Sequence, residues 1–169
     1  GDVYKRQARL NAWAMKNFQQ WLSDPERGKV ARDYLAVRRI SADSIAQWNL
    51  GVAPNAVDAL AKAAAAQKVP AQLLQQGGLT AGTGQDKFVH RLMFPIADAT
   101  GRCIGFGGRT LSDAGAKYIN SPTTPLFDKS NTLYGLDRAR HRIVATGTVI
   151  VVEGYTDVIM AHQFGCTNV

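Results

Sequence analysis

The chain has 169 residues, of which 46% are hydrophobic and 20% charged, a balance that allows one globular domain with a buried core. No apolar run approaches the roughly 20 residues of a membrane-spanning helix, and Cys103 and Cys166 are far apart, so we expect a cytoplasmic protein with reduced thiols and no membrane partner. The net charge of +7 favours a polyanionic partner, because basic side chains that contact phosphates release condensed counterions, although a solvated basic surface fits it too.

The first half of the chain has the pattern of helices. Apolar residues recur at helical spacing from Ala8 to about Leu22, and Pro25 marks the start of a second amphipathic helix. Residues 1–7 fit no pattern and carry no weight in these predictions. The further elements that we expect are a helix over residues 42–48 capped by Ser41, a turn at Gly51–Pro54, an alanine-rich helix capped by Asn55 that ends near Gln67, and a helix over residues 71–76.

From about Asp86 the pattern changes to that of a sheet. Strands are predicted for residues 88–96 and 103–110, joined by a hairpin turn that ends at Gly101. Residues 117–128 contain two prolines and many turn formers, so we expect an ordered loop on the sheet. A short helix is predicted from Leu133 to about Arg140.

Near the end of the chain the pattern is that of a strand, a tight turn and a helix. Residues 148–152 (TVIVV) form a β-branched run typical of a strand buried on both faces in a parallel sheet, and a helix is predicted for residues 156–163. Glu153 then lies at the carboxyl end of the strand, where ligands bind in open α/β sheets. Asp157, one helical turn later, either faces the same crevice or caps the helix. A surface glutamate at an ordinary turn is the alternative for Glu153.

Six motifs resemble those of one family. Val151–Val158 reads VVEGYTDV, which resembles the glutamate motif of the TOPRIM fold, a metal-dependent α/β module of bacterial primases and topoisomerases. Upstream, RLMFPI, GFGGR, KYINSP, F-x-K-S and LYGL follow one another in the order and at the spacing of bacterial replicative (DnaG-type) DNA primases. The resemblance covers about residues 10–169.

This resemblance implies an α+β fold in three parts. Residues 1–84 would be the helical part of the primase core, residues 85–146 a mixed or antiparallel sheet subdomain with a basic template- and nucleotide-binding loop, and residues 147–169 the first β–α unit of a truncated TOPRIM domain. The implied activity is the synthesis of short RNA primers on single-stranded DNA by metal-dependent nucleotidyl transfer. We expect these 169 residues alone to be inactive, because the family's further metal-binding acids lie beyond Val169.

The resemblance also implies cofactors and partners. Mg²⁺ (or Mn²⁺) is expected at Glu153, the catalytic residue, with Asp157 as a second metal ligand; both offer the oxygen atoms that Mg²⁺ prefers. Zn²⁺ would be bound by an N-terminal domain that these residues do not include. The implied partners are single-stranded DNA, nucleoside triphosphates and a replicative helicase, the last through a C-terminal domain that is also outside the chain.

Basic and polar residues near the motifs are the candidate binding residues. Arginine grips a phosphate with two donors, whereas lysine acts as a mobile point charge. A solvated surface is the alternative for each cation, and Asn120 and Ser121 fit equally well as loop caps. We assign structural turns to Gly154, Gly107 and Gly108, with a glycine-rich strand as the alternative for the last two. The candidates for contacts with nucleic acid or nucleotide are Arg91, Arg109, Lys117, Tyr118, Asn120, Ser121 and Lys129.

Three positions depart from the family pattern, and two other functions stay open. Val89 stands where a basic residue is frequent, Asp128 stands in place of the usual histidine, and Thr156 replaces the common methionine. These changes affect details of template binding. The alternatives are another TOPRIM enzyme, such as a phage primase-helicase, a topoisomerase or a nuclease, and a nucleic-acid-binding module without activity. Dependence on a metal separates the enzymes from the module.

Overall fold

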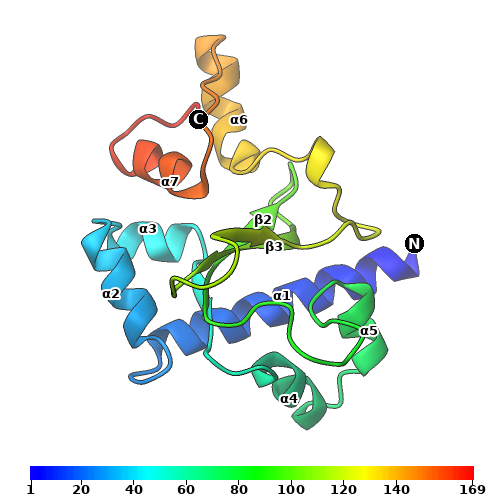
Figure 1. The fold of residues 1–169 in the computed structure, drawn as a ribbon. Helices are drawn as coiled ribbons and strands as arrows, with labels where there is room; N and C mark the ends of the chain where they lie inside the picture. The colour runs from blue at the N-terminus through cyan, green and yellow to red at the C-terminus, as the bar shows by residue number, and fades with distance from the viewer.

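The computed structural model describes residues 1–169, in which helices surround a four-stranded antiparallel sheet of order β1-β2-β3-β4 (Figure 1). The predicted α+β class and the helical first half are confirmed. None of the helices combines the length and the apolar character needed to span a membrane. The strands are β1 (Gly51–Ala53), β2 (Arg91–Ala97), β3 (Cys103–Thr110) and β4 (Tyr118–Asn120), and the helices are α1 (Asp2–Ser23), α2 (Lys29–Val37), α3 (Ala42–Gln47), α4 (Ala59–Ala66), α5 (Ala71–Gln76), the 3-10 turn η1 (Lys129–Asn131), α6 (Leu136–Thr146) and α7 (Tyr155–Gln163).

The sheet separates two layers of helices. Helix α1 crosses one face, and α6 and α7 lie on the opposite side (Figure 1). On the α1 side, the rings of Phe18 and Phe106 meet edge to face with centroids 5.3 Å apart. On the α7 side, the rings of Phe94 and Tyr155 stack with centroids 4.9 Å apart. Because successive side chains of a strand point to opposite faces, β2 contributes to both apolar clusters, with Met93 in the first and Leu92 and Phe94 in the second.

Helix α1 begins six residues earlier than the pattern predicts, and its second turn reaches the core. Gln7 and Leu10 are buried. Gly77 approaches Gln7 so closely that a Cβ atom at Gly77 would lie 2.2 Å from its amide nitrogen. Residues 2–7 therefore belong to the helix, with residues 2–6 exposed and Gln7 buried. The contact that buries Gln7 comes from a residue far along the chain.

Helix α2 starts at Lys29 and not at the predicted Pro25, because Asp24 forms a turn in between. The Oδ1 atom of Asp24 accepts hydrogen bonds from the backbone nitrogens of Glu26 (2.9 Å) and Arg27 (2.8 Å), which satisfies them without a helix. The predicted cap of α3 is confirmed: the Oγ atom of Ser41 accepts from the backbone nitrogen of Ser44 at 3.1 Å.

Two short strands lie where a turn and a loop were predicted. Residues 51–53 form the buried strand β1, which pairs with β2, and Tyr118–Asn120 form β4, which pairs with β3. Three residues are too few to show an alternating pattern, so only the pairing reveals them. At Gly51 a Cβ atom would lie 2.5 Å from the Cβ of Phe18, so this glycine lets β1 pack directly on α1.

The start of helix α4 is capped from a distance. The predicted cap, Asn55, lies outside the helix, which begins at Ala59. The Asp86 carboxylate instead accepts hydrogen bonds from the backbone nitrogens of Leu60 (2.7 Å) and Ala61 (3.0 Å). Burial raises the pKa of Asp86, while the two hydrogen bonds oppose that rise. The cap therefore ties the loop before β2 to α4.

Replacing this cap is expected to destabilise the fold. Asp86→Ala leaves the backbone N–H groups of Leu60 and Ala61 without this acceptor, and losing such a cap costs about 0.5–2 kcal/mol. Asp86→Asn, whose amide oxygen still accepts, is the matched variant and should recover part of the loss. Urea unfolding followed by circular dichroism measures both. Equal midpoints for Asp86→Ala and the native chain would contradict the assigned role.

The run TVIVV is not a strand in this structure. Residues 148–152 are exposed, Val151 to 72%, and their links to the rest of the chain include a backbone hydrogen bond from Ile150 to Asn168 of 2.9 Å. The prediction of a buried parallel strand was wrong for these residues, because no strand lies beside this segment to complete a ladder.

Helix α6 begins at Leu136 and not at the predicted Leu133. Gly135, at φ 84°, directly precedes the helix.

Candidate nucleotide and nucleic-acid site

Glu153 lies exposed at the turn before α7 and forms no ion pair. The next residue, Gly154, donates its backbone N–H to the Oδ2 atom of Asp157 at 3.1 Å. Asp157 therefore caps the start of α7, one of its two predicted roles, and a carboxylate there also stabilises the helix dipole. Its role as a metal ligand stays a prediction, and its Oδ1 atom forms no hydrogen bond.

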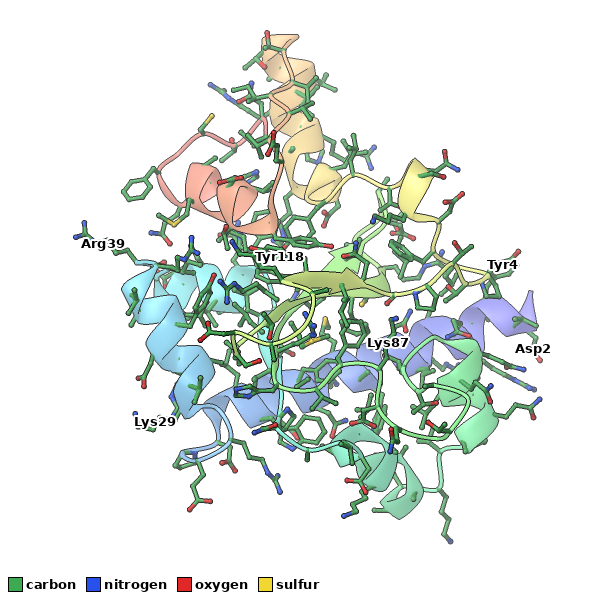
Figure 2. The ribbon with its side chains drawn as sticks, in the orientation of Figure 1. Asp2, Tyr4, Lys29, Arg39, Lys87 and Tyr118 are labelled. Carbon is green, nitrogen blue, oxygen red and sulfur yellow. The ribbon has the colours of Figure 1, made fainter.

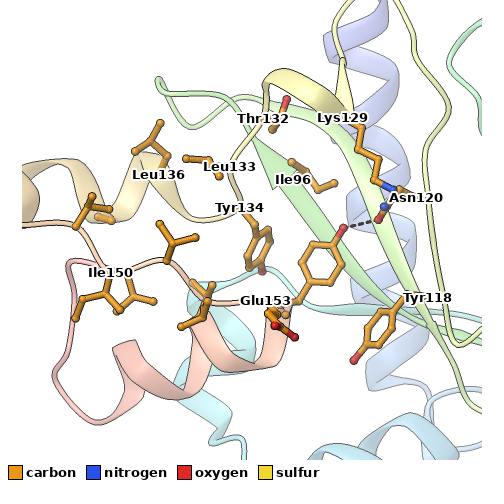
Figure 3. Close-up of a pocket in the computed structure, with 18 of the residues that line it drawn as sticks. Ile96, Tyr118, Asn120, Lys129, Thr132, Leu133, Tyr134, Leu136, Ile150 and Glu153 are labelled. Carbon is orange, nitrogen blue, oxygen red and sulfur yellow. Dashed lines mark hydrogen bonds between the residues drawn. The ribbon is translucent and has the colours of Figure 1, made fainter.

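A cavity of about 480 Å³ opens beside Glu153 (Figure 3). One part of its wall is apolar and is formed by residues of α6 and of the segment 149–152. The polar part of the wall brings together Glu153 and three of the candidate binding residues, Tyr118, Asn120 and Lys129. These four residues come from β4, η1 and the turn before α7, so the fold places a carboxylate, an ammonium group and an amide around one cavity.

Asn120 and Ser121 differ in whether their side chains keep a free hydrogen-bond donor beside the cavity. The side chain of Ser121 is buried, and its Oγ atom accepts a hydrogen bond from the backbone nitrogen of Phe106 at 2.9 Å. Ser121 thus holds the loop against β3. Asn120 accepts the hydroxyl of Tyr155 at its Oδ1 atom and forms no hydrogen bond through its amide nitrogen. Asn120 keeps a free donor beside the cavity.

Arg91 lies inside the fold. Its guanidinium donates to the carbonyl oxygens of Gly108 (3.1 Å), Ala116 (2.8 Å) and Lys117 (3.4 Å), and burial lowers its pKa. The arginine therefore holds the loop between β3 and β4 in place. Its predicted contact with nucleic acid stays a prediction, and its two terminal nitrogens already donate to these carbonyl oxygens.

Arg109 lies on β3 directly opposite Tyr118 of β4, and outside the wall of the cavity. Its guanidinium lies 4.6 Å from the centre of the Tyr34 ring, and that of Arg38 lies 5.3 Å from the same ring. Sequence reasoning missed Arg38, because only the folded chain brings α2 beside β3. Tyr34 thus joins two arginines at one end of the sheet.

Lys117 and Lys129 are exposed, and no carboxylate oxygen lies within 4.0 Å of either ammonium group. Lys117 precedes β4, and Lys129 opens η1. Asp128, the departure next to Lys129, accepts from the backbone nitrogen of Ser130 at 3.0 Å, and the hydroxyl of Ser130 holds its pKa below the usual value. The carboxylate of Asp128 is therefore engaged in its own turn.

Tyr118 is the exposed aromatic residue of this region, with 38% of its surface accessible. Its ring lies 6.2 Å from that of Tyr155, and Figure 2 shows it between the sheet and α7. The other tyrosines of the region, Tyr134 and Tyr155, pack against the apolar cluster between the sheet and α7. Tyr118 therefore keeps a face on which a base can stack.

Gly107 and Gly108 lie within strand β3. The prediction of turns there was wrong, and the alternative of a glycine-rich strand is confirmed. A Cβ atom at Gly107 would lie 2.4 Å from the hydroxyl of Tyr155, and one at Gly108 would lie 2.9 Å from the Phe88 ring. Both glycines make room for aromatic rings on the two faces of the sheet. Gly154 lies at the predicted bend with φ −126°, an extended conformation open to any residue.

The carboxylates near the cavity fit part of a magnesium site. Glu153 and Asp157 are separated by one helical turn, and no group of three or more His, Cys, Asp or Glu residues gathers in the structure to hold a metal ion. Mg²⁺ is commonly bound through one or two carboxylates together with waters and substrate phosphates. The donor set of these residues is compatible with that kind of site.

Comparisons with known proteins agree on one family. The family model described as the N-terminal domain of the DNA primase catalytic core matches residues 17–140. The DNA primase of Deinococcus radiodurans is 45% identical over 99% of this chain, which spans 28% of that protein's length. The crystal structure of the RNA polymerase domain of Mycobacterium tuberculosis primase DnaG is 35% identical, with a TM-score of 0.90 over 97% of this chain and 55% of that one.

A further solved structure, that of a DnaG primase catalytic domain bound to single-stranded DNA, is 36% identical, with a TM-score of 0.88 over 98% of this chain and 55% of that one. The matched residues include α2 to β4, which carry most of the candidate residues. The chain spans about half of these solved domains. Sequence and fold together show that the chain belongs to the DnaG-type DNA primase family.

Proposed function

We propose that the chain acts in the template-directed synthesis of RNA primers on single-stranded DNA, by metal-dependent nucleotidyl transfer. The observation that carries the proposal is the cavity whose wall Glu153 shares with Lys129, Asn120 and Tyr118. A relative's catalytic domain has been solved with single-stranded DNA bound, and the net charge of +7 suits a polyanionic template. Residues 147–169 would be the start of the TOPRIM domain.

The reaction is the attack of a primer 3′ hydroxyl on the α-phosphate of a nucleoside triphosphate, with pyrophosphate as the leaving group. Negative charge grows on the phosphoryl oxygens, so fixed cations and hydrogen-bond donors provide most of the stabilisation. In this proposal Lys129 neutralises phosphate charge, and the free amide nitrogen of Asn120 donates to a phosphate or sugar oxygen. Tyr118 stacks on a base.

Glu153 would hold the Mg²⁺ or Mn²⁺ ion, with Asp157 beside it. A bound divalent ion supplies charge stabilisation to the phosphoryl oxygens and orients the triphosphate. Lys117 and Arg109 lie at the β3–β4 side of Tyr118, where they would grip the template backbone. The binding of zinc and of a replicative helicase is assigned to other domains of the family, and both stay predictions.

Single-stranded DNA binding tests the basic part of this interface. Lys117→Ala and Lys129→Ala should each weaken binding of a fluorescent oligodeoxynucleotide and lower the slope of log K against log salt by about 0.7, the value for one lost phosphate contact on a single strand. Arg109→Ala should behave likewise. Lys62→Ala, which removes a lysine paired with Asp58 on the distant helix α4, is the control. Salt slopes equal to that of the control would place the template elsewhere.

A further inference from the structure

Tyr155 follows Glu153 by two residues, and its side chain leaves the first turn of α7 toward the sheet. Its ring is parallel to that of Phe94, at 10° and 4.9 Å. It meets the ring of Tyr134 nearly at right angles, at 89° and 4.7 Å. Two aromatic contacts at different angles fix both the place and the tilt of the ring.

The sheet has a matching recess for this ring at Gly107. A Cβ atom at Gly107 would lie 2.4 Å from both the Cζ and the hydroxyl of Tyr155, so a side chain there would exclude the ring from its present place. Asn120 is the residue of β4 that lies opposite Gly107. The ring of Tyr155 therefore covers the cross-strand pair of Gly107 and Asn120.

The hydroxyl of Tyr155 completes this contact. It donates to the Oδ1 atom of Asn120, a bond drawn as the dashed line in Figure 3. A phenol has an ordinary pKa of about 10, so the hydroxyl keeps its proton and remains a donor at neutral pH. Because the oxygen of the amide is occupied, the amide nitrogen of Asn120 is the end left for other partners.

The contacts of Glu153 itself do little to fix its place. The segment before it is exposed, its carboxylate forms no hydrogen bond, and the cap from Asp157 joins α7 only to its own first residue. Val158 and Ile159 pack in the same apolar cluster as Phe94 and hold the helix on the sheet. The bond from Tyr155 to Asn120 is the one hydrogen bond in the structure between α7 and β4.

We infer that Tyr155 is a positioning residue. The contact of its ring with Gly107 and of its hydroxyl with Asn120, here called the tyrosine clasp, sets the place of Glu153 relative to the binding loop and turns the amide nitrogen of Asn120 toward the cavity. The importance of this for primer synthesis rests on the proposed function, whereas the placement of Glu153 by the clasp can be measured without any activity.

Spin labels on the 169-residue chain test the placement. Labels attached at Glu153→Cys and Lys62→Cys, with Cys166→Ser to remove the exposed native thiol, report the distance from the turn to helix α4. Tyr155→Phe, which keeps the ring but loses the hydrogen bond, and Gly107→Ala, which displaces the ring, should each broaden the distance distribution about twofold, as expected when a tethered turn becomes a mobile one. A second pair, Lys16→Cys with Lys62→Cys, lies outside the clasp and should keep its width.

The outcomes separate the two levels of the proposal. Unchanged widths for Tyr155→Phe and for any folded Gly107→Ala chain would overturn the clasp, whatever the fate of the proposed function. If the widths of the distance distributions change, the next experiment measures primer extension. It uses Deinococcus radiodurans primase in which these 169 residues replace the matching segment. There Tyr155→Phe should lower kcat about tenfold with a nearly constant KM for nucleotide, the pattern of a mispositioned group. Loss of rate through KM alone would contradict positioning, and an active Glu153→Gln enzyme would refute the proposed function instead.

Discussion

Glu153→Gln is expected to abolish primer synthesis in the Deinococcus radiodurans primase that carries these 169 residues, lowering the rate by at least about 10²-fold. Removing one group that stabilises developing charge in a transition state costs about 10²–10³ in kcat in well-studied enzymes. The glutamine has nearly the shape of the glutamate but no charge, and a neutral amide is a poor ligand for Mg²⁺. Incorporation of labelled ribonucleotides on a single-stranded template measures the effect.

Template affinity separates this result from general damage. Because Glu153 is exposed and forms no ion pair, the substitution should leave folding and single-stranded DNA binding nearly unchanged. Glu26→Gln, which alters an exposed glutamate before α2, is the matched control and should retain full activity. If Glu153→Gln synthesised primers as well as this control, the chain would be better described as a binding module than as part of a catalytic site.

Phe106→Ala should be the most destabilising single substitution of the sheet. The side chain is fully buried and meets the rings of Phe18 at 5.3 Å and of Phe88 at 6.5 Å. Truncating a buried phenylalanine to alanine costs about 3–5 kcal/mol, through lost burial and the cavity left behind. Since a domain of this size has about 5–15 kcal/mol of stability in total, the variant should be close to unfolding. Guanidinium unfolding followed by circular dichroism gives the difference.

Phe164→Ala provides the comparison for the same chemical change. Phe164 follows α7 and is 78% exposed, and surface substitutions usually change stability by less than about 0.5 kcal/mol. A similar loss for both variants would mean that the packing of Phe106 between α1 and the sheet is looser than the ring distances indicate.

The sequence predicted elements well where the pattern is local and long. Helical periodicity located α1 and the short helices α3 and α5, and alternation with turn residues located β2 and β3. The sequence-based prediction failed where a residue far along the chain determines an element or its boundary. Asp86 caps α4 from 26 positions away, and β1 exists only because β2 pairs with it. The run TVIVV shows the converse, because β-branched composition cannot make a strand without a neighbour.

The structure divides the predicted site residues by whether their polar groups already have partners in the fold. Lys129, Asn120 and Tyr118 share a cavity with Glu153. Arg91 and Ser121 have the same polar character in the sequence, yet Arg91 donates to backbone carbonyls and Ser121 accepts from a backbone nitrogen. Residue type and spacing cannot reveal such partners, because they belong to segments that meet only after folding. Family motifs therefore mark a neighbourhood, and hydrogen bonds decide which side chains in it are free.

The guanidinium of Arg91 shapes a region that it does not reach itself. Its hydrogen bonds to Ala116 and Lys117 end on carbonyl oxygens of the loop that leads into β4. Only the planar fork of arginine spans several acceptors in this way, whereas a lysine offers donors from a single nitrogen. The buried Arg91 thus holds the backbone of the loop from which the exposed Lys117 extends. In an alanine scan of DNA affinity, a substitution of Arg91 would therefore act indirectly, by loosening the loop that carries Lys117.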